Sequence, residues 1–462
     1  MTMPLSIPPA SADLLPRLIF WETTRGCNLR CVHCRATATE LSSPDDLSTE
    51  TCLNLIDQIA SFSRPILILT GGEPLFRKDI FEIASYGTKK GLRMALATNG
   101  TLVDDDVADK IAAAGFQRVS ISLDGADAAT HDAFRMIPGS FDAAVAGLKR
   151  LRARGMSVQI NTTVAKHNAD QLPQVLKLTQ DLGADAFHIF LLVPVGCGVE
   201  IGQEQMISAR QYEEILNWWY DQSKTVMMDL KATCAPHYFR IRVQRIMDEK
   251  MRGETPQPFV APGTQAKAGH VDVVTTPDGQ GLPTPALSAM TRGCLAGTGV
   301  CFISHRGEVF PCGYLPVAAG DVKSRPFEEI WRDSPVFANL RNPHMLGGKC
   351  GQCEYKFICE GCRARAYAQT GDYMAEEPFC AYEPGERRVG EIHDLHMTSD
   401  SPMPETTIPW SEDARAAVAR SPFFIRAKIV SFVEAYAREN GLASINAGTV
   451  AAARCKGESL VR

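Results

Sequence analysis

Three cysteines follow an apolar run in one short stretch, Thr23-Thr24-Arg25-Gly26-Cys27-Asn28-Leu29-Arg30-Cys31-Val32-His33-Cys34. A four-iron cluster is normally held by four cysteine thiolates. Cys27, Cys31 and Cys34 would therefore leave one iron open to a ligand from outside the protein. The alternative is a set of buried or zinc-binding cysteines, which the spacing favours less because zinc sites usually pair a CxxC with a second half-site.

The ends of the following apolar runs also carry residues suited to ligand binding. The second run ends in Gly71-Gly72-Glu73-Pro74, where the missing Cβ atoms let a ligand approach the backbone closely. The next two runs end in Asn99 and in a stretch that contains Ser120, Ser122 and Asp124. Ordinary turn and cap chemistry is the alternative for these polar residues.

The CxxxCxxC spacing, with His33 before the third cysteine, resembles the radical SAM superfamily, and the Gly71–Pro74 turn resembles its GGEP motif. The resemblance implies a [4Fe-4S] cluster whose open iron chelates S-adenosyl-L-methionine and yields a 5′-deoxyadenosyl radical. It implies no catalytic residue beyond the cluster ligands. The cosubstrate-binding residues that it implies are Gly71, Gly72, Glu73, Pro74, Asn99, Ser120, Ser122, Asp124 and His33.

A second group of cysteines resembles the SPASM extension, which binds auxiliary iron-sulfur clusters. The resemblance implies one or two auxiliary [4Fe-4S] clusters, the first on Cys294, Cys301, Cys312 and Cys362, and the second on Cys350, Cys353, Cys359 and Cys380. The chain departs from the usual pattern in having two residues, rather than three, between Cys359 and Cys362. A structural zinc on Cys350, Cys353, Cys359 and Cys362 is the alternative.

Short apolar runs alternate with stretches that carry apolar residues at helical spacing, which predicts a parallel sheet with its chemistry at the carboxyl ends of the strands. We expect an α/β fold: a partial (β/α)6 radical SAM barrel, a Cys-rich SPASM domain and a small all-α domain. The strands are expected at 18–21, 66–69, 93–97, 119–123, 158–163 and 186–192.

Changes in composition suggest the domain boundaries. Residues 200–250 are expected to be helical, and 251–289 lose their periodicity and are rich in Pro, Gly, Thr and Gln. The expected parts are a barrel core at 16–235, a helical and loop connection at 236–290, a SPASM domain at 291–385, a linker at 386–405 and a helical domain at 406–456.

The overall composition excludes several classes of protein. The net charge of −5 argues against nucleic-acid binding, and no apolar run is long enough to span a membrane. The first residues show no basic and apolar pattern of a signal peptide. Together with thiols that need reducing surroundings, these features predict a cytoplasmic protein.

Three segments indicate the substrate. Residues 350–372 resemble the radical SAM enzymes of heme and d1-type heme biosynthesis, as does the segment that carries Cys234, His237 and Arg240. A thiol, an imidazole and a guanidinium suit an iron-bound macrocycle bearing carboxylates, although a helix start at Pro236 with a buried cysteine is equally compatible. Residues 409–437 resemble the C-terminal helical domain of a light-independent protochlorophyllide reductase subunit, or are an amphipathic helical bundle.

The resemblances predict oxidative decarboxylation or side-chain removal on a tetrapyrrole in heme-type cofactor biosynthesis, with an electron donor such as ferredoxin or flavodoxin. A SPASM peptide or protein maturase is the first alternative; no small peptide-recognition domain is evident before Phe20. A non-catalytic iron-sulfur electron carrier is the second, and such a carrier would not need the GGEP turn or the Ser-x-Ser-x-Asp stretch.

Overall fold

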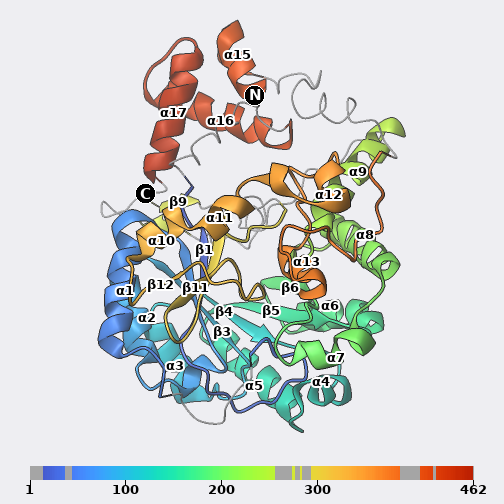
Figure 1. The fold of residues 1–462 in the computed structure, drawn as a ribbon. Coiled ribbons are helices and arrows are strands. Elements are labelled where there is room, and N and C mark those ends of the chain that lie inside the picture. The colour runs from blue at the N-terminus through green and yellow to red at the C-terminus, as the bar shows by residue number, and fades with distance from the viewer. Residues whose placement is uncertain are drawn as a thin grey trace, which may run out of the picture. The chain divides into compact units, whose positions relative to one another are not determined.

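A computed structural model describes residues 14–36, 44–254, 273–275, 281–283, 293–385, 406–419 and 423–460. These residues form two compact units, one drawn from 1–351 with 355–382 and the other from 352–354 with 383–462 (Figure 1). The predicted linker at 386–405 lies outside the described residues. No described helix is long and apolar enough to cross a membrane.

The larger unit is built on one ten-stranded sheet in the order β12-β11-β10-β1-β2-β3-β4-β5-β6-β7. Strands β1 to β7 are all parallel, and β10 adds to β1 in the same direction. Among the described strands β7 and β12 are the two edges, so the sheet stays open. The strands are β1 Leu18–Glu22, β2 Ile66–Thr70, β3 Arg93–Thr98, β4 Arg118–Ser122, β5 Ser157–Val164, β6 Ala186–Leu191, β7 Asp229–Thr233, β10 Val300–Ile303, β11 Glu308–Phe310 and β12 Gly320–Asp321.

Helices connect the parallel strands, as the alternating pattern predicts, and the α/β fold class is confirmed. Helix α1 begins after Ser48, whose hydroxyl accepts a hydrogen bond from the Thr51 amide. The helices of the barrel are α1 Thr49–Phe62, α2 Ile80–Lys89, α3 Asp105–Ala113, α4 Ala128–Arg135, α5 Ser140–Ala153, α6 Leu172–Asp181, α7 Gly198–Gln205, α8 Ala209–Thr225 and α9 His237–Met251. The later part has α10 Phe327–Asp333, α11 Pro335–Leu340, α12 Gly348–Gln352 and α13 Arg363–Thr370, and a separate hairpin of β8 Val273–Thr275 and β9 Gly281–Pro283.

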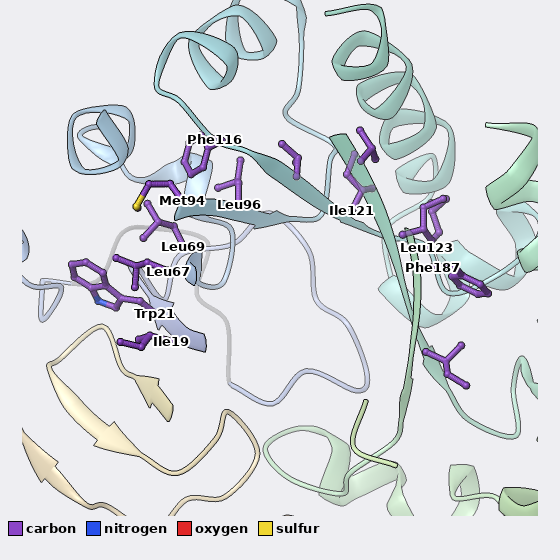
Figure 2. Close-up of a cluster of buried hydrophobic side chains, with 14 of the residues drawn as sticks. Ile19, Trp21, Leu67, Leu69, Met94, Leu96, Phe116, Ile121, Leu123 and Phe187 are labelled. Carbon is purple, nitrogen blue, oxygen red and sulfur yellow. The ribbon is translucent and has the colours of Figure 1, made fainter. Parts of the chain in front are cut away.

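The two faces of the sheet have opposite chemistry. Alternate side chains of a strand point to opposite faces, and on one face apolar residues from successive strands form the main core (Figure 2). The other face carries polar residues at the intervening positions, including Ser120 and Ser122 on β4, Asn161 on β5 and His188 on β6. Packing of the apolar face therefore holds the strands in place, and the polar face can line a binding site.

The stretch from 200 to 250 is not wholly helical, so that prediction is wrong at β7. Asp229–Thr233 pairs in parallel with β6, where Phe187 aligns with Leu230 and Ile189 with Ala232. The strand is short and carries polar residues between its apolar ones, a pattern too brief to separate from the flanking helices α8 and α9. It contributes a seventh parallel strand beyond the six expected.

The smaller unit contains α15 Glu412–Ala419, α16 Phe423–Glu439 and α17 Ala447–Leu460. Its apolar cluster includes Trp410, Val433 and Ile445. The buried carboxylate of Glu434 accepts hydrogen bonds from the Thr407 amide at 2.8 Å and from the Trp410 ring nitrogen at 3.3 Å. One acidic side chain thus attaches the segment before α15 to the middle of α16.

Candidate active site

The loop with the first three cysteines is held against the Gly71-Gly72 turn. The amide of Gly72 donates to the Thr24 carbonyl at 2.8 Å, and the Glu73 amide donates to the Gly26 carbonyl at 2.6 Å. A Cβ atom added to Gly72 would lie 2.4 Å from the Gly26 oxygen. Only glycine allows this approach, so the two motifs form one piece of backbone at adjacent strand ends.

Glu22 and Arg35 close the two ends of the cysteine loop, a feature that the sequence analysis missed. Arg35 donates to one carboxylate oxygen of Glu22 at 2.6 Å, and His305 Nδ1 lies 2.7 Å from the other. Burial alone would raise the pKa of Glu22, but Arg35 and His305 lower it to about 2. The carboxylate therefore stays charged and fixes where the loop begins and ends.

Glu73 is fully buried and its hydrogen bonds reach the next strand end. Its carboxylate accepts from the Thr98 hydroxyl at 2.7 Å, from the Asn99 amide at 2.8 Å and from the Leu75 amide at 3.2 Å. Burial raises its pKa to about 7. The residue aligns the GGEP turn with the end of β3, and its predicted contact with the cosubstrate amino group stays a prediction.

Asn99 lies beside the first cysteine. Its side-chain amide donates to Asn28 at 2.8 Å and approaches the Cys27 sulfur at 4.0 Å. Asn28 in turn donates to the Thr101 hydroxyl at 2.8 Å. The structure therefore brings Asn99 together with the cysteine loop, as expected for parallel strands whose carboxyl ends share one edge.

Asp124 and His33 belong to a buried network next to the loop. Arg135 forms an ion pair with Asp124 at 2.6 Å and donates to the Cys31 sulfur at 3.5 Å. His33 lies 3.5 Å from Asp124 and stacks on Phe134 with the ring centres 4.1 Å apart. Burial lowers the pKa of His33 to about 3, so its ring is neutral. In this arrangement Asp124 orients Arg135 toward the Cys31 sulfur.

Ser120 and Ser122 align on the polar face of the sheet with Gln159 and Asn161 of β5. The Gln159 amide donates to Asn161 at 2.7 Å. These residues form a polar strip across β4 and β5 on the face of the sheet opposite the main core. Their predicted role toward the cosubstrate stays a prediction.

The first three cysteines have the surroundings that an iron-sulfur cluster requires. Burial raises the pKa of Cys27 to about 12, so a thiolate there needs positive iron beside it. The Leu29 amide donates to the Cys27 sulfur at 3.4 Å and Arg135 to that of Cys31, and such donors stabilise a cluster's sulfur ligands. Among the described residues no group of His, Cys, Asp and Glu is spaced for a single metal ion.

The second group of cysteines forms two sets that meet at Cys350. Cys294, Cys312 and Cys362 belong to one apolar cluster, together with Cys234 and Cys350. The thiols of Cys350 and Cys380 are both close enough to Cys359 to raise its pKa, after the larger effect of burial. Cys353 falls in the smaller compact unit. The structure places Cys301 apart from these residues, in the main core behind the sheet.

A buried ion pair lies between these sets. Arg365 donates to Glu377 at 3.0 Å with both side chains fully buried. The Glu377 carboxylate also accepts from the Cys362 amide at 2.7 Å, and its own amide donates to the Cys350 sulfur at 3.3 Å. Glu377 therefore fixes one cysteine of each set, and no sequence signal marks it.

His237 and Arg240 lie in the first turn of α9. His237 is 1% exposed, and burial lowers its pKa to about 3. Arg240 pairs with Glu213 and lies over the Tyr382 ring at 4.9 Å. Both side chains are buried in the larger unit, and their substrate contacts stay predictions.

Comparison with protein families identifies the class. Residues 21–179 match the radical SAM superfamily, 294–362 match the SPASM iron-sulfur cluster-binding domain, and 410–454 match a model described as the proto-chlorophyllide reductase 57 kD subunit. The fold and the site thus define a radical SAM enzyme with an iron-sulfur cluster-binding domain.

Relatives define the family more closely. The chain is 50% identical to the AdoMet-dependent heme synthase of Methanosarcina barkeri over 372 residues, 80% of this chain and 98% of the relative. It is 48% identical to that of Nitratidesulfovibrio vulgaris, over 80% of this chain and 93% of the relative. The pre-heme d1 synthase of Dinoroseobacter shibae is 34% identical over 81% and 88% of the two chains. The chain belongs to the family of the AdoMet-dependent heme synthases.

Solved structures support the fold. Streptococcus suis SuiB bound to its precursor peptide SuiA superposes with a TM-score of 0.59 at 15% identity, over 80% of this chain and 76% of that one. The structure of anSMEcpe with bound AdoMet gives a TM-score of 0.54 at 16% identity, over 79% and 94% of the two chains. At these identities the likeness concerns the fold alone.

Proposed function

We propose that the protein makes heme by oxidative decarboxylation of propionate side chains on an iron-bound porphyrin. The observation that carries the proposal is the 50% identity to an AdoMet-dependent heme synthase over 98% of that relative. The three cysteines next to a GGEP turn supply the place for radical generation, and the polar face of the sheet supplies a place for a charged substrate.

The bound cluster and S-adenosyl-L-methionine supply an oxidising radical that takes one hydrogen atom from unactivated carbon. Cys27, Cys31 and Cys34 would hold that cluster. The missing Cβ of Gly71 lets the turn pack against Thr24, because a Cβ there would lie 2.6 Å from the Thr24 oxygen. Glu73 and Asn99 keep the turn and the loop aligned through the hydrogen bonds described above.

The polar face of the sheet offers a recognition site for the propionates. Asn161, His188 and Lys231 align across β5, β6 and β7. Burial lowers the pKa of Lys231, and among the described residues no carboxylate lies within ion-pairing distance of it. A carboxylate brought next to this lysine would be stabilised by a charge-assisted hydrogen bond.

Removal of one propionate carboxyl leaves an electron that needs an acceptor. The side chain loses a hydrogen atom from the carbon next to the macrocycle and then carbon dioxide, and a vinyl double bond forms as one electron departs. We propose that an auxiliary cluster accepts this electron, which is a reason for the second cysteine group.

The test is anaerobic incubation of the reconstituted protein with S-adenosyl-L-methionine, a reductant and iron-coproporphyrin III, followed by mass and absorption spectra. We expect the loss of carbon dioxide and two hydrogens for each converted propionate, with stoichiometric 5′-deoxyadenosine. Formation of 5′-deoxyadenosine without any change in iron-coproporphyrin III would overturn the proposal. Didecarboxysiroheme serves as the second substrate, and its selective conversion would instead indicate a pre-heme d1 activity.

A peptide maturase is the second candidate, favoured by 30% identity to the mycofactocin maturase MftC of Mycolicibacterium smegmatis over 79% of this chain. A mass change in a co-encoded peptide, with the porphyrin unchanged, would support it. For the heme reaction we further propose an electron donor such as ferredoxin or flavodoxin and a cytoplasmic location, because cysteines kept for clusters need reducing surroundings.

A further inference from the structure

Cys234 lies among the auxiliary cysteines although it falls outside the SPASM match. It follows the last residue of β7 and packs in the same apolar cluster as Cys294, Cys312, Cys350 and Cys362, around Leu315 and Val193. Burial raises the pKa of its thiol well above the usual value, and the thiols of Cys362, Cys312 and Cys294 raise it further. Cys234 and these three thiols come from four separate segments and lie close together, whereas Cys350, the fifth cysteine of the cluster, also lies close to Cys359 of the other set.

Cys301 occupies different surroundings. It aligns with Ile19 in the pairing of β10 with β1 and is fully buried. Its neighbours in the core include Ile19, Trp21 and Ile303, the apolar side chains on the helix-covered face of the sheet. Val300 and Phe302, its neighbours in the strand, point to the opposite face of the sheet. Cys301 could reach the auxiliary cysteines only if the side chains of β10 exchanged faces.

The backbone at Cys234 is also unusual. Its φ is +56°, and among the described non-glycine residues it shares the left-handed region with Met136 and Glu360. This conformation strains any residue with a Cβ atom, whereas glycine adopts it freely. Residues in strained backbone conformations are found most often at functional sites. The conformation of Cys234 therefore suggests a functional role for its thiol.

We propose that Cys234, and not Cys301, completes a four-thiolate site with Cys294, Cys312 and Cys362 that holds one auxiliary [4Fe-4S] cluster. The inference deepens the auxiliary-cluster part of the proposed function and rests on it. It gives that cluster four protein ligands and no open iron, which suits electron acceptance. It also ties the iron-sulfur domain to the end of the seventh strand of the barrel.

The test uses the full chain with Cys27, Cys31 and Cys34 replaced by Ala, so that the auxiliary clusters alone contribute iron. In this background we compare three proteins after anaerobic reconstitution: the variant with Cys234→Gly, the variant with Cys301→Ala, and the background protein without a further substitution. Cys234→Gly removes the thiol and relieves the backbone strain, so the fold is kept. We expect it to lose about half of the iron and sulfide that two clusters supply and one set of electron paramagnetic resonance signals, while Cys301→Ala keeps both.

Full iron content in Cys234→Gly would overturn the proposal, as would loss of one cluster in Cys301→Ala with Cys234→Gly unaffected. Circular dichroism of the unreconstituted proteins checks that each variant folds. The iron measurement does not depend on the heme reaction. If the otherwise native enzyme leaves iron-coproporphyrin III unchanged, the proposed function fails while the assignment of Cys234 is still decided by iron and sulfide.

Discussion

The two cysteine sites of the larger unit are assembled in different ways. Cys27, Cys31 and Cys34 come from a single loop after β1, whereas the set around Cys362 draws on the end of β7, the segments on either side of β10 and β11, and the start of α13. The first site has three thiols and polar neighbours such as Asn99. The second lies in an apolar cluster, and the four thiols that we propose for it are those of Cys234, Cys294, Cys312 and Cys362. A local site can leave one iron for a cosubstrate, and a non-local site can enclose its cluster and join two domains.

The largest effect is expected from removing the local site, which consists of the three cysteines in the loop after β1. Replacing Cys27, Cys31 and Cys34 by Ala is expected to abolish cleavage of S-adenosyl-L-methionine and to remove one cluster's iron, because it removes all three thiolates that would hold that cluster. Product formation by chromatography and iron content measure this. Cys52→Ala, at a buried cysteine on α1, is the control and keeps both. Undiminished cleavage in the triple variant would mean that the site is elsewhere.

The non-local site is expected to depend on the Glu377–Arg365 pair. Glu377→Ala leaves Arg365 buried without its partner and frees the Cys362 amide, so the unfolding free energy should fall by roughly 3–5 kcal/mol. Chemical denaturation measures the loss. Asp181→Ala, which removes an exposed pair with Lys177, is the control and should cost about 0.3–0.5 kcal/mol. Equal effects of the two changes would refute the role of Glu377.

Glu22 tests how firmly the local loop is held. Glu22→Gln should lower stability by roughly 1–3 kcal/mol at neutral pH, because it weakens the bonds to Arg35 and His305. The folded pKa of Glu22 is about 2, below its ordinary value of 4.5. The stabilisation is therefore present above pH 4.5 and is lost as the pH falls through 2.

Denaturation curves of the Glu22→Gln variant and the unmodified protein should accordingly differ at pH 7 and converge toward pH 2–3. Arg306→Ala, which removes a more exposed pair with Asp45, provides the control with little effect at any pH. A difference between the curves that grew on acidification would contradict the assignment.

The smallest effect on the chemistry is expected from the separate helical unit. Glu434→Gln weakens the acceptor for the Thr407 amide and the Trp410 ring nitrogen, at a cost of about 1–2 kcal/mol to that unit. Hydrogen exchange should rise around Thr407 and Ile408 while cleavage of S-adenosyl-L-methionine stays unchanged. A loss of cleavage would show that this unit contributes to one of the two cysteine sites.

The sequence predicted the parts of the molecule that are encoded locally. The strand-helix alternation, the cysteine loop and the GGEP turn are short patterns whose spacing fixes their geometry, and the structure brings Asn99 to the loop as expected. It could not predict contacts between distant segments. Glu22 and His305 are 283 residues apart, and no local pattern couples them. The neighbours of Cys234 and the side on which Cys301 lies depend on the same long-range register.

The addition of β10 to the barrel sheet has a mechanical consequence. Four aligned residue pairs join β10 to β1, the strand that leads into the cysteine loop. Relative motion of the iron-sulfur region and the barrel would have to break this ladder of backbone hydrogen bonds, so the two are not connected by a hinge. The distance between the cysteine loop after β1 and the cysteines that flank β10 and β11 is therefore set by a stiff framework.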